Sequence, residues 1–128
     1  MAVIADSSTL IDFLDGKPIA QVEDAVAAGT LVFAPLAIAE LLSGNTTPRQ
    51  RETIGEWLQE FPLHKTPLAH WMAVGAMRRM LRSHGLNVTI PDTHMAQCAL
   101  DLNATLLTRD EIFLRISAHT SLRLAQLR

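Results

Sequence analysis

The chain has 128 residues, of which 48% are hydrophobic and 19% charged, with one cysteine and a formal net charge of −2. This length predicts a single domain over residues 1–128, and the composition excludes intrinsic disorder, an intramolecular disulfide and a cysteine-rich metal site. With no basic leader and no run of about 20 apolar residues, we expect a soluble cytoplasmic protein that does not enter a membrane.

The first third of the chain alternates between apolar strands and helices with capping residues. Small polar residues follow the first strand as helix caps, and glycine or proline marks the later boundaries. In chain order, the pattern predicts a buried strand at Met1–Ala5, a helix capped within Ser7–Thr9 and closed by Gly16, a helix at Pro18–Ala28, a strand at Thr30–Ala34 and a helix at Pro35–Leu42.

The remainder is predicted to be mostly helical, with one clear strand. Apolar residues at helical spacing follow Pro48 and Pro67. The expected elements are a helix from Pro48 to Phe61, a short strand or linker at Pro62–Thr66, a helix at Pro67–His84, a loop at Leu86–Ile90, a helix at Thr93–Leu102, a strand at Ala104–Thr108, a turn and short helix at Arg109–Ser117, and a last strand or helix at Thr120–Leu127.

Strands that alternate with helices indicate an α/β fold with a central parallel sheet and helices on both faces. Functional groups in such sheets gather beyond the carboxyl ends of the strands. Asp6 follows the first strand, and Asp110 lies two residues after the strand that ends at Thr108. Asp92 begins a helix, and Glu40 is the single charge in an otherwise apolar helix.

Each of these acids also has a simpler interpretation. Asp92 and Asp110 suit helix caps, Asp6 suits a turn, and Glu40 can face solvent at a helix edge. Taken together, the four can converge at one edge of the sheet. A group of carboxylates with no lysine beside it favours Mg²⁺ or Mn²⁺, which can activate water and neutralise a phosphate.

Four segments in order give the chain a resemblance to PIN-domain ribonucleases of the VapC toxin type. The segments span nearly the whole chain: residues 4–12 (IADSSTLID), 37–44 (AIAELLSG), 90–96 (IPDTHMA) and 106–110 (LLTRD). The resemblance implies a PIN-like three-layer fold. It also implies that Asp6, Glu40, Asp92 and Asp110 are catalytic and bind Mg²⁺ or Mn²⁺, with Ser8 and Thr108 in support.

The activity implied by this resemblance is metal-dependent endoribonuclease cleavage of RNA phosphodiester bonds, often in transfer RNA. The family's proteins are toxins of type II toxin–antitoxin systems. The implied partners are an RNA substrate, a VapB-type antitoxin that alone contacts operator DNA, and a second copy in a homodimer. Relatives often have Asp directly before Phe113, where this chain has Ile112, so the relative roles of Asp110 and Glu111 stay open.

Two other functional classes share the size and the α/β pattern. A receiver-like phospho-acceptor domain needs an acidic pair near the end of the first strand and a late lysine. Here Asp6 is followed by Ser7 and Ser8, and no lysine follows Lys65. A non-catalytic interaction module is the other alternative, and the presence of all four acids argues against it.

The histidines suggest little chemistry at the level of sequence. His94 and Cys98 lie four residues apart on one helix face, which is a spacing of metal ligands. Because no second cysteine exists and no other histidine is close in sequence, we expect both to pack in the core. The remaining histidines are expected at the surface or at its rim: His64, His70, His84 and His119.

Overall fold

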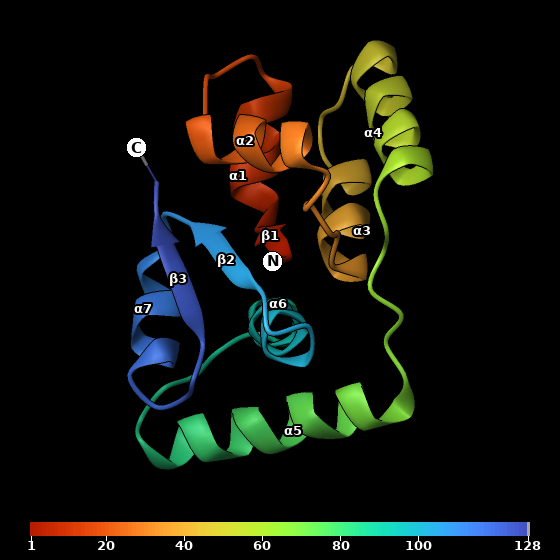
Figure 1. Cartoon of the computed structure of the whole chain (residues 1–128). Helices are drawn as coiled ribbons and strands as arrows, with labels where there is room; N and C mark the ends of the chain where they lie inside the picture. The colour runs from red at the N-terminus through yellow and green to blue at the C-terminus, as the bar shows by residue number, and fades with distance from the viewer. Residues whose placement is uncertain (128) are drawn as a thin grey trace.

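A parallel three-stranded sheet forms the centre of the computed structural model, which describes residues 1–127. The strands lie in the order β1 (Val3–Ala5), β2 (Thr105–Thr108) and β3 (Arg123–Gln126) (Figure 1). β2 pairs in parallel with both neighbours, so the three carboxyl ends share one edge. Of the two structures that the sequence allowed for residues 120–127, the chain adopts the strand.

Helices cover both faces of this sheet. Along β1 and β2, Ile4 and Leu106 pack in one hydrophobic cluster, whereas Ala5 and Leu107 pack in another. The first cluster contains residues of α5, α6 and α7, and the second contains residues of α1 to α4. The predicted α/β architecture with a doubly covered parallel sheet is therefore confirmed. The helices are α1 (Ser7–Leu14), α2 (Ala20–Ala28), α3 (Pro35–Ser43), α4 (Pro48–Glu60), α5 (Leu68–Ser83), α6 (Ile90–Asp101) and α7 (Glu111–Ser117).

The strand predicted at Thr30–Ala34 forms only two isolated parallel bridges, Val3 with Leu31 and Phe33 with Leu63. This segment is extended and buried, but it changes partners after two residues. The Val32 amide donates to the Val3 carbonyl, and the Phe33 amide donates to the Pro62 carbonyl, so neither partner forms a continuous ladder. The prediction was right about extended backbone and wrong about a regular strand.

Helix α6 begins three residues earlier than predicted, at Ile90 instead of Thr93. The hydroxyl of Thr89 accepts from the Asp92 amide at 3.2 Å, and Pro91 occupies the first turn, where no amide donor is needed. Thr89 is therefore the N-cap. The Asp92 carboxylate lies inside the first turn and is not used as the cap.

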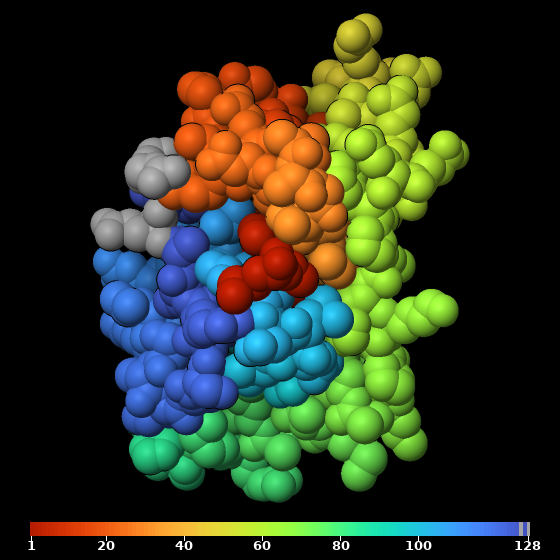
Figure 2. Space-filling view, viewed as in Figure 1, coloured from red at the N-terminus to blue at the C-terminus, as the bar shows by residue number. Residues whose placement is uncertain are grey.

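Figure 2 shows the side of the molecule on which the N-terminus lies. The N-terminal residues (red) lie exposed between the C-terminal segment (blue) and the chain that follows α6, and Met1 is 76% exposed. In the same view, β2 and β3 run across the picture toward the C-terminus (Figure 1). Within residues 1–127, every helix is too short or too polar to cross a lipid bilayer.

Candidate active site

Asp6 links the end of β1 to the start of α1. Its side chain is buried, with 5% of the residue exposed, and it caps α1 by accepting from the Thr9 amide at 3.0 Å. Oδ1 also accepts from Ser8 Oγ at 3.3 Å, and Oδ2 accepts from Thr108 Oγ1 at 2.5 Å. These hydrogen bonds hold the carboxylate in one orientation at the edge of the sheet.

Thr108, the last residue of β2, connects Asp6 to Asp110. Its hydroxyl donates to Asp6 and accepts from the Asp110 amide at 3.0 Å. Asp110 is exposed and caps α7, because Oδ1 accepts from the Ile112 amide at 3.0 Å. The helix-cap interpretation of Asp110 is thus correct, and it is compatible with a second role for the same carboxylate. Glu111 is also exposed, at the first position of α7.

Glu40 and Asp92 complete the acidic group from α3 and α6, and α3 packs against both α1 and α6. Partial burial of the carboxylate raises the pKa of Glu40, a hydrogen bond with Ser7 lowers it, and the charges of Asp92 and Asp6 raise it further. The pKa of Asp92 is raised by burial, lowered by its bond with Thr89, and raised by the charges of Asp110 and Asp6. The structure therefore brings the four carboxylates within electrostatic reach of one another.

The donor set of this group suits a hard divalent cation. Its atoms are carboxylate and hydroxyl oxygens, and the ion pairs found within residues 1–127 involve Asp12 and Asp101 instead. Within residues 1–127, the ligand trio found within 4.8 Å lies elsewhere, so no three of these carboxylates approach one another that closely. A looser arrangement is compatible with Mg²⁺, which binds through one or two carboxylates and keeps several waters.

Two cations lie at the rim, and neither reaches the four carboxylates. Arg109 Nη1 lies 3.3 Å from Asp12 Oδ2, and Lys17 Nζ lies 3.1 Å from Asp12 Oδ1. Asp12 thus holds Arg109 away from the neighbouring Asp110. The negative charge of the four acids stays uncompensated by these side chains.

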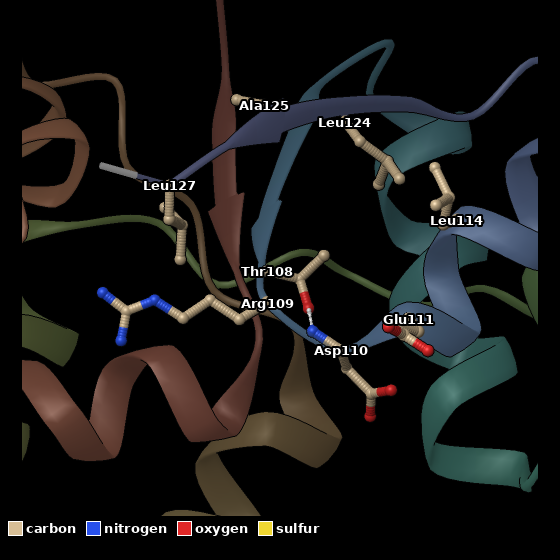
Figure 3. Close-up of a pocket in the computed structure, with 8 residues that line it drawn as sticks. All are labelled: Thr108, Arg109, Asp110, Glu111, Leu114, Leu124, Ala125 and Leu127. Carbon is tan, nitrogen blue, oxygen red and sulfur yellow. Dashed lines mark hydrogen bonds between the residues drawn. The ribbon is translucent and has the colours of Figure 1, made fainter.

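An open cavity of about 600 Å³ adjoins Asp110, between the β2–α7 turn and the last strand. In Figure 3, Leu114 and Leu124 lie on one side of this space and Leu127 lies on the other side, near Arg109, with Thr108 and Asp110 between them. Asp110 donates its amide to the Thr108 hydroxyl, while its carboxylate turns away from the leucines. The cavity therefore offers an apolar wall beside an acidic rim.

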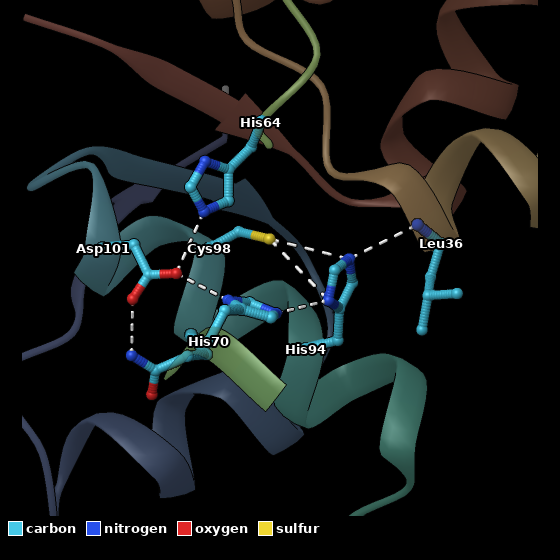
Figure 4. Close-up of polar contacts among 7 residues, drawn as sticks. Leu36, His64, His70, His94, Cys98 and Asp101 are labelled. Carbon is cyan, nitrogen blue, oxygen red and sulfur yellow. Dashed lines mark hydrogen bonds and ion pairs between the residues drawn. The ribbon is translucent and has the colours of Figure 1, made fainter. Parts of the chain in front are cut away.

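A second polar cluster, at the other end of α6, was missed by sequence reasoning. His70 Nδ1 lies 2.5 Å and His64 Nε2 3.0 Å from Asp101 Oδ2, and His70 Nε2 lies 2.7 Å from His94 Nδ1 (Figure 4). The surface position expected for His70 is wrong, because its side chain is fully buried. His94 and Cys98 do pack in the core, as predicted.

The Leu36 amide determines which ring nitrogens of this cluster carry protons. The Leu36 amide donates to His94 Nε2 at 3.3 Å, so neutral His94 carries its proton on Nδ1 and donates to His70 Nε2. His70 then donates Nδ1–H to Asp101. His94 thereby satisfies a free amide in the first turn of α3, whose N-cap residue Ala34 has no side-chain acceptor.

Replacing His94 should destabilise the protein strongly. His94→Leu leaves the Leu36 amide and the His70 ring without partners in the core, which costs about 2–4 kcal/mol of unfolding free energy. His94→Gln keeps an acceptor and should cost less. Urea denaturation measures both variants, with exposed His119→Gln as the control expected to stay within about 0.5 kcal/mol of the wild type. A His94→Leu variant as stable as that control would show that the hydrogen-bond chain contributes nothing.

The role of His94 also predicts how the unfolding free energy depends on pH. Burial, together with the charges of His70 and His64, lowers the pKa of His94 from 6.5 to about 4. A base whose pKa is depressed on folding stabilises the fold above its unfolded pKa and loses that contribution as pH falls. We therefore expect wild-type stability to fall more steeply between pH 6.5 and 4 than that of His94→Gln. Equal slopes would contradict this assignment.

Comparison with known proteins agrees with this fold. The PIN domain family model matches residues 3–118. No curated protein sequence matches the chain. Among solved structures, chains of VapBC2 from Rickettsia felis bound to a promoter DNA fragment (18% identity, 100% of both chains covered, TM-score 0.82) and of VapBC-1 from nontypeable Haemophilus influenzae (19% identity, 98% of both chains, TM-score 0.77) share its fold.

DNA-bound VapBC from Salmonella typhimurium is similar to the same degree, with 17% identity, a TM-score of 0.81 and coverage of 98% of this chain and 97% of that one. At such identities the likeness concerns the fold alone. The family match is independent of it and spans β1 to α7, including every carboxylate described above. The chain belongs to the PIN-domain family.

Proposed function

We propose that this chain is the toxin of a type II toxin–antitoxin system and acts as a metal-dependent endoribonuclease. The observation that carries the proposal is the convergence of Asp6, Glu40, Asp92 and Asp110 at the carboxyl edge of a PIN-domain sheet, with no cation of residues 1–127 paired to them. The solved relatives include complexes of toxin and antitoxin, some with DNA. This supports a VapB-type antitoxin as the partner that contacts operator DNA.

In this proposal the four carboxylates hold Mg²⁺ or Mn²⁺, which supplies a water polarised for attack on phosphorus and charge neutralisation at the phosphate. The chain's own residues set the geometry. Thr108 and the Thr9 amide fix the Asp6 carboxylate, and the Asp110 amide fixes Thr108. Glu40 has a raised pKa and an exposed position, so it is the carboxylate suited to accept and release a proton.

The direct test is cleavage of RNA by the purified chain at Mg²⁺ or Mn²⁺ concentrations typical of cells. We expect internal cuts that stop when a chelator is added and resume when the ion is restored. Sequencing of the RNA ends after induced expression then identifies the substrate, with transfer RNA as the first class to inspect. If no new RNA ends appear at a level of expression that arrests growth, the nuclease assignment is wrong.

The basic end of α5 should add RNA affinity. Residues 65–128 hold eight bases and four acids, and Arg79 and Arg82 are exposed on α5. Arg78 is half-buried and donates to the Val88 carbonyl at 2.8 Å, so it is left unchanged. Replacing Arg79 and Arg82 by Ala should weaken RNA binding. If each arginine contacts one phosphate, the slope of log K against log salt concentration should become shallower by about 1.4 for single-stranded RNA.

Filter binding at several salt concentrations measures this slope. The control is Arg49→Ala with Arg51→Ala, which removes two arginines from the remote helix α4. An unchanged slope for the α5 variant would assign Arg79 and Arg82 to solvent. An equal effect of both variants would point to bulk charge instead of a specific edge.

A further inference from the structure

The histidine cluster combines ligand types that the acidic group lacks. The loop after α4 contributes His64, the first turn of α5 contributes His70, and α6 contributes Cys98 with Asp101 one turn further on. One ring nitrogen of His64, one of His70 and the Cys98 sulfur all lie within 4.8 Å of one another. Asp92 is nine residues from Asp101 on the same helix, which is about 14 Å along its axis, so the two clusters are separate.

We propose that His64, His70 and Cys98 bind a zinc-class transition-metal ion, with the Asp101 carboxylate beside the two imidazoles as their hydrogen-bond partner. Two imidazoles and a thiolate are typical ligands of tetrahedral Zn²⁺, with bonds of about 2.0–2.3 Å. Such bonds place ligand atoms about 3.3–3.6 Å from one another. The three atoms, which lie within 4.8 Å of one another, therefore need to approach by at most about 1.5 Å, which side-chain rotations provide.

The charges at this position also match a divalent ion. A Cys98 thiolate and the Asp101 carboxylate together neutralise a charge of +2, which a buried site requires. Burial, together with the charge of Asp101, raises the pKa of the Cys98 thiol to about 12. The thiol therefore holds its proton, and metal binding releases that proton to solvent as the metal–sulfur bond forms.

Neighbouring side chains orient the ligands. Gln97 Nε2 donates to Asp101 Oδ1 at 2.8 Å, which leaves Oδ2 toward the two imidazoles. If His70 binds the metal through Nε2, its Nδ1–H keeps the hydrogen bond to Asp101, and the His94 Nδ1–H gives up its acceptor to the metal. Hydrogen bonds of this kind fix ring orientation around metal sites.

The site should select a different metal from the acidic group. Nitrogen and sulfur ligands favour Zn²⁺ and Co²⁺, whereas Mg²⁺ requires oxygen ligands. His64 has 11% of its side chain exposed, while that of His70 is fully buried, so an ion enters past His64. This inference does not depend on the proposed nuclease activity, because none of the four acidic residues takes part.

Titration of the purified chain with Co²⁺ alone tests the proposal. We expect one equivalent to bind with the thiolate-to-cobalt charge-transfer band and the intense visible bands of tetrahedral coordination, and Zn²⁺ to displace it. Cys98→Ala should abolish the charge-transfer band, and His64→Gln should weaken Co²⁺ binding by about tenfold or more. His64 lies at the rim, so its variant tests the site even if Cys98→Ala folds poorly.

The matched control removes two histidines elsewhere. His84 and His119 stack at 4.2 Å on the surface, and the double change to Gln should leave the cobalt spectrum unaltered. Excess Mg²⁺ should not displace the ion. If Co²⁺ gives no charge-transfer band in the wild type, or if its binding is lost in Asp6→Asn but not in His64→Gln, the metal proposal is wrong and the cluster is a hydrogen-bonded support for α3.

Discussion

Asp6→Asn should lower the rate of RNA cleavage by at least about 100-fold, which is the effect of removing one preorganised charged group from a phosphoryl-transfer site. Asparagine keeps the shape of the side chain and an oxygen that can accept from the Thr9 amide, so α1 retains its cap. It removes the negative charge that the cation requires. Expression of the variant should accordingly relieve growth arrest at equal protein level.

The control for this prediction is Asp12→Asn, on the same helix. Asp12 pairs with Lys17 and Arg109 at the rim and contributes to neither pKa shift in the acidic group. Its variant should keep most of the cleavage rate, because exposed ion pairs contribute little. Circular dichroism melts of both variants exclude unfolding as the cause. Undiminished cleavage by Asp6→Asn would refute the assignment of Asp6 as an essential ligand.

Asp92→Asn should separate charge repulsion from metal binding. In the presence of chelator the variant should be at least as stable as the wild type, because repulsion with Asp110 and Asp6 is removed and Thr89 still caps α6. In the wild type, an ion at 100 times its Kd adds about 2.7 kcal/mol to the unfolding free energy. We expect the variant to lose most of this gain, which corresponds to about 10 °C in Tm.

The sign of the pH dependence provides a second check. The pKa of Asp92 is raised on folding, so its destabilising effect is present at neutral pH and disappears as the folded carboxylate takes up a proton. The advantage of Asp92→Asn in chelator should therefore vanish as pH falls toward 4. Exposed Asp24→Asn serves as the control. A variant that is much less stable in chelator yet keeps the whole metal-dependent gain would make Asp92 a structural residue.

The features that depend on local sequence pattern could be predicted. The helix after Ala5 was predicted, although its cap was assigned to Ser7–Thr9 and the structure uses Asp6, and the apolar run before Arg109 becomes β2. The convergence of four acids followed from the rule that parallel strands share a carboxyl edge. Their catalytic role stays a prediction. Glu40 is exposed at the edge of its helix, as the simpler interpretation had it, yet its pKa responds to Asp92 and Asp6.

What depended on distant packing was not predictable. His64 and His70 are 30 and 24 residues from His94 in the sequence, and only the packing of α5 along α6 brings them together. A lone histidine carries no signal of burial by itself. Similarly, residues 30–34 have strand composition, but whether they form a ladder depends on the partners available at Val3 and Leu63.

The two ends of α6 respond to acid in opposite directions. The pKa of Asp92 is raised in the fold and that of Asp101 is lowered, so on unfolding in acid Asp92 tends to release a proton and Asp101 tends to take one up. The two contributions to the pH dependence of the unfolding free energy therefore have opposite signs. A substitution at either end of α6 would expose the contribution of the other end.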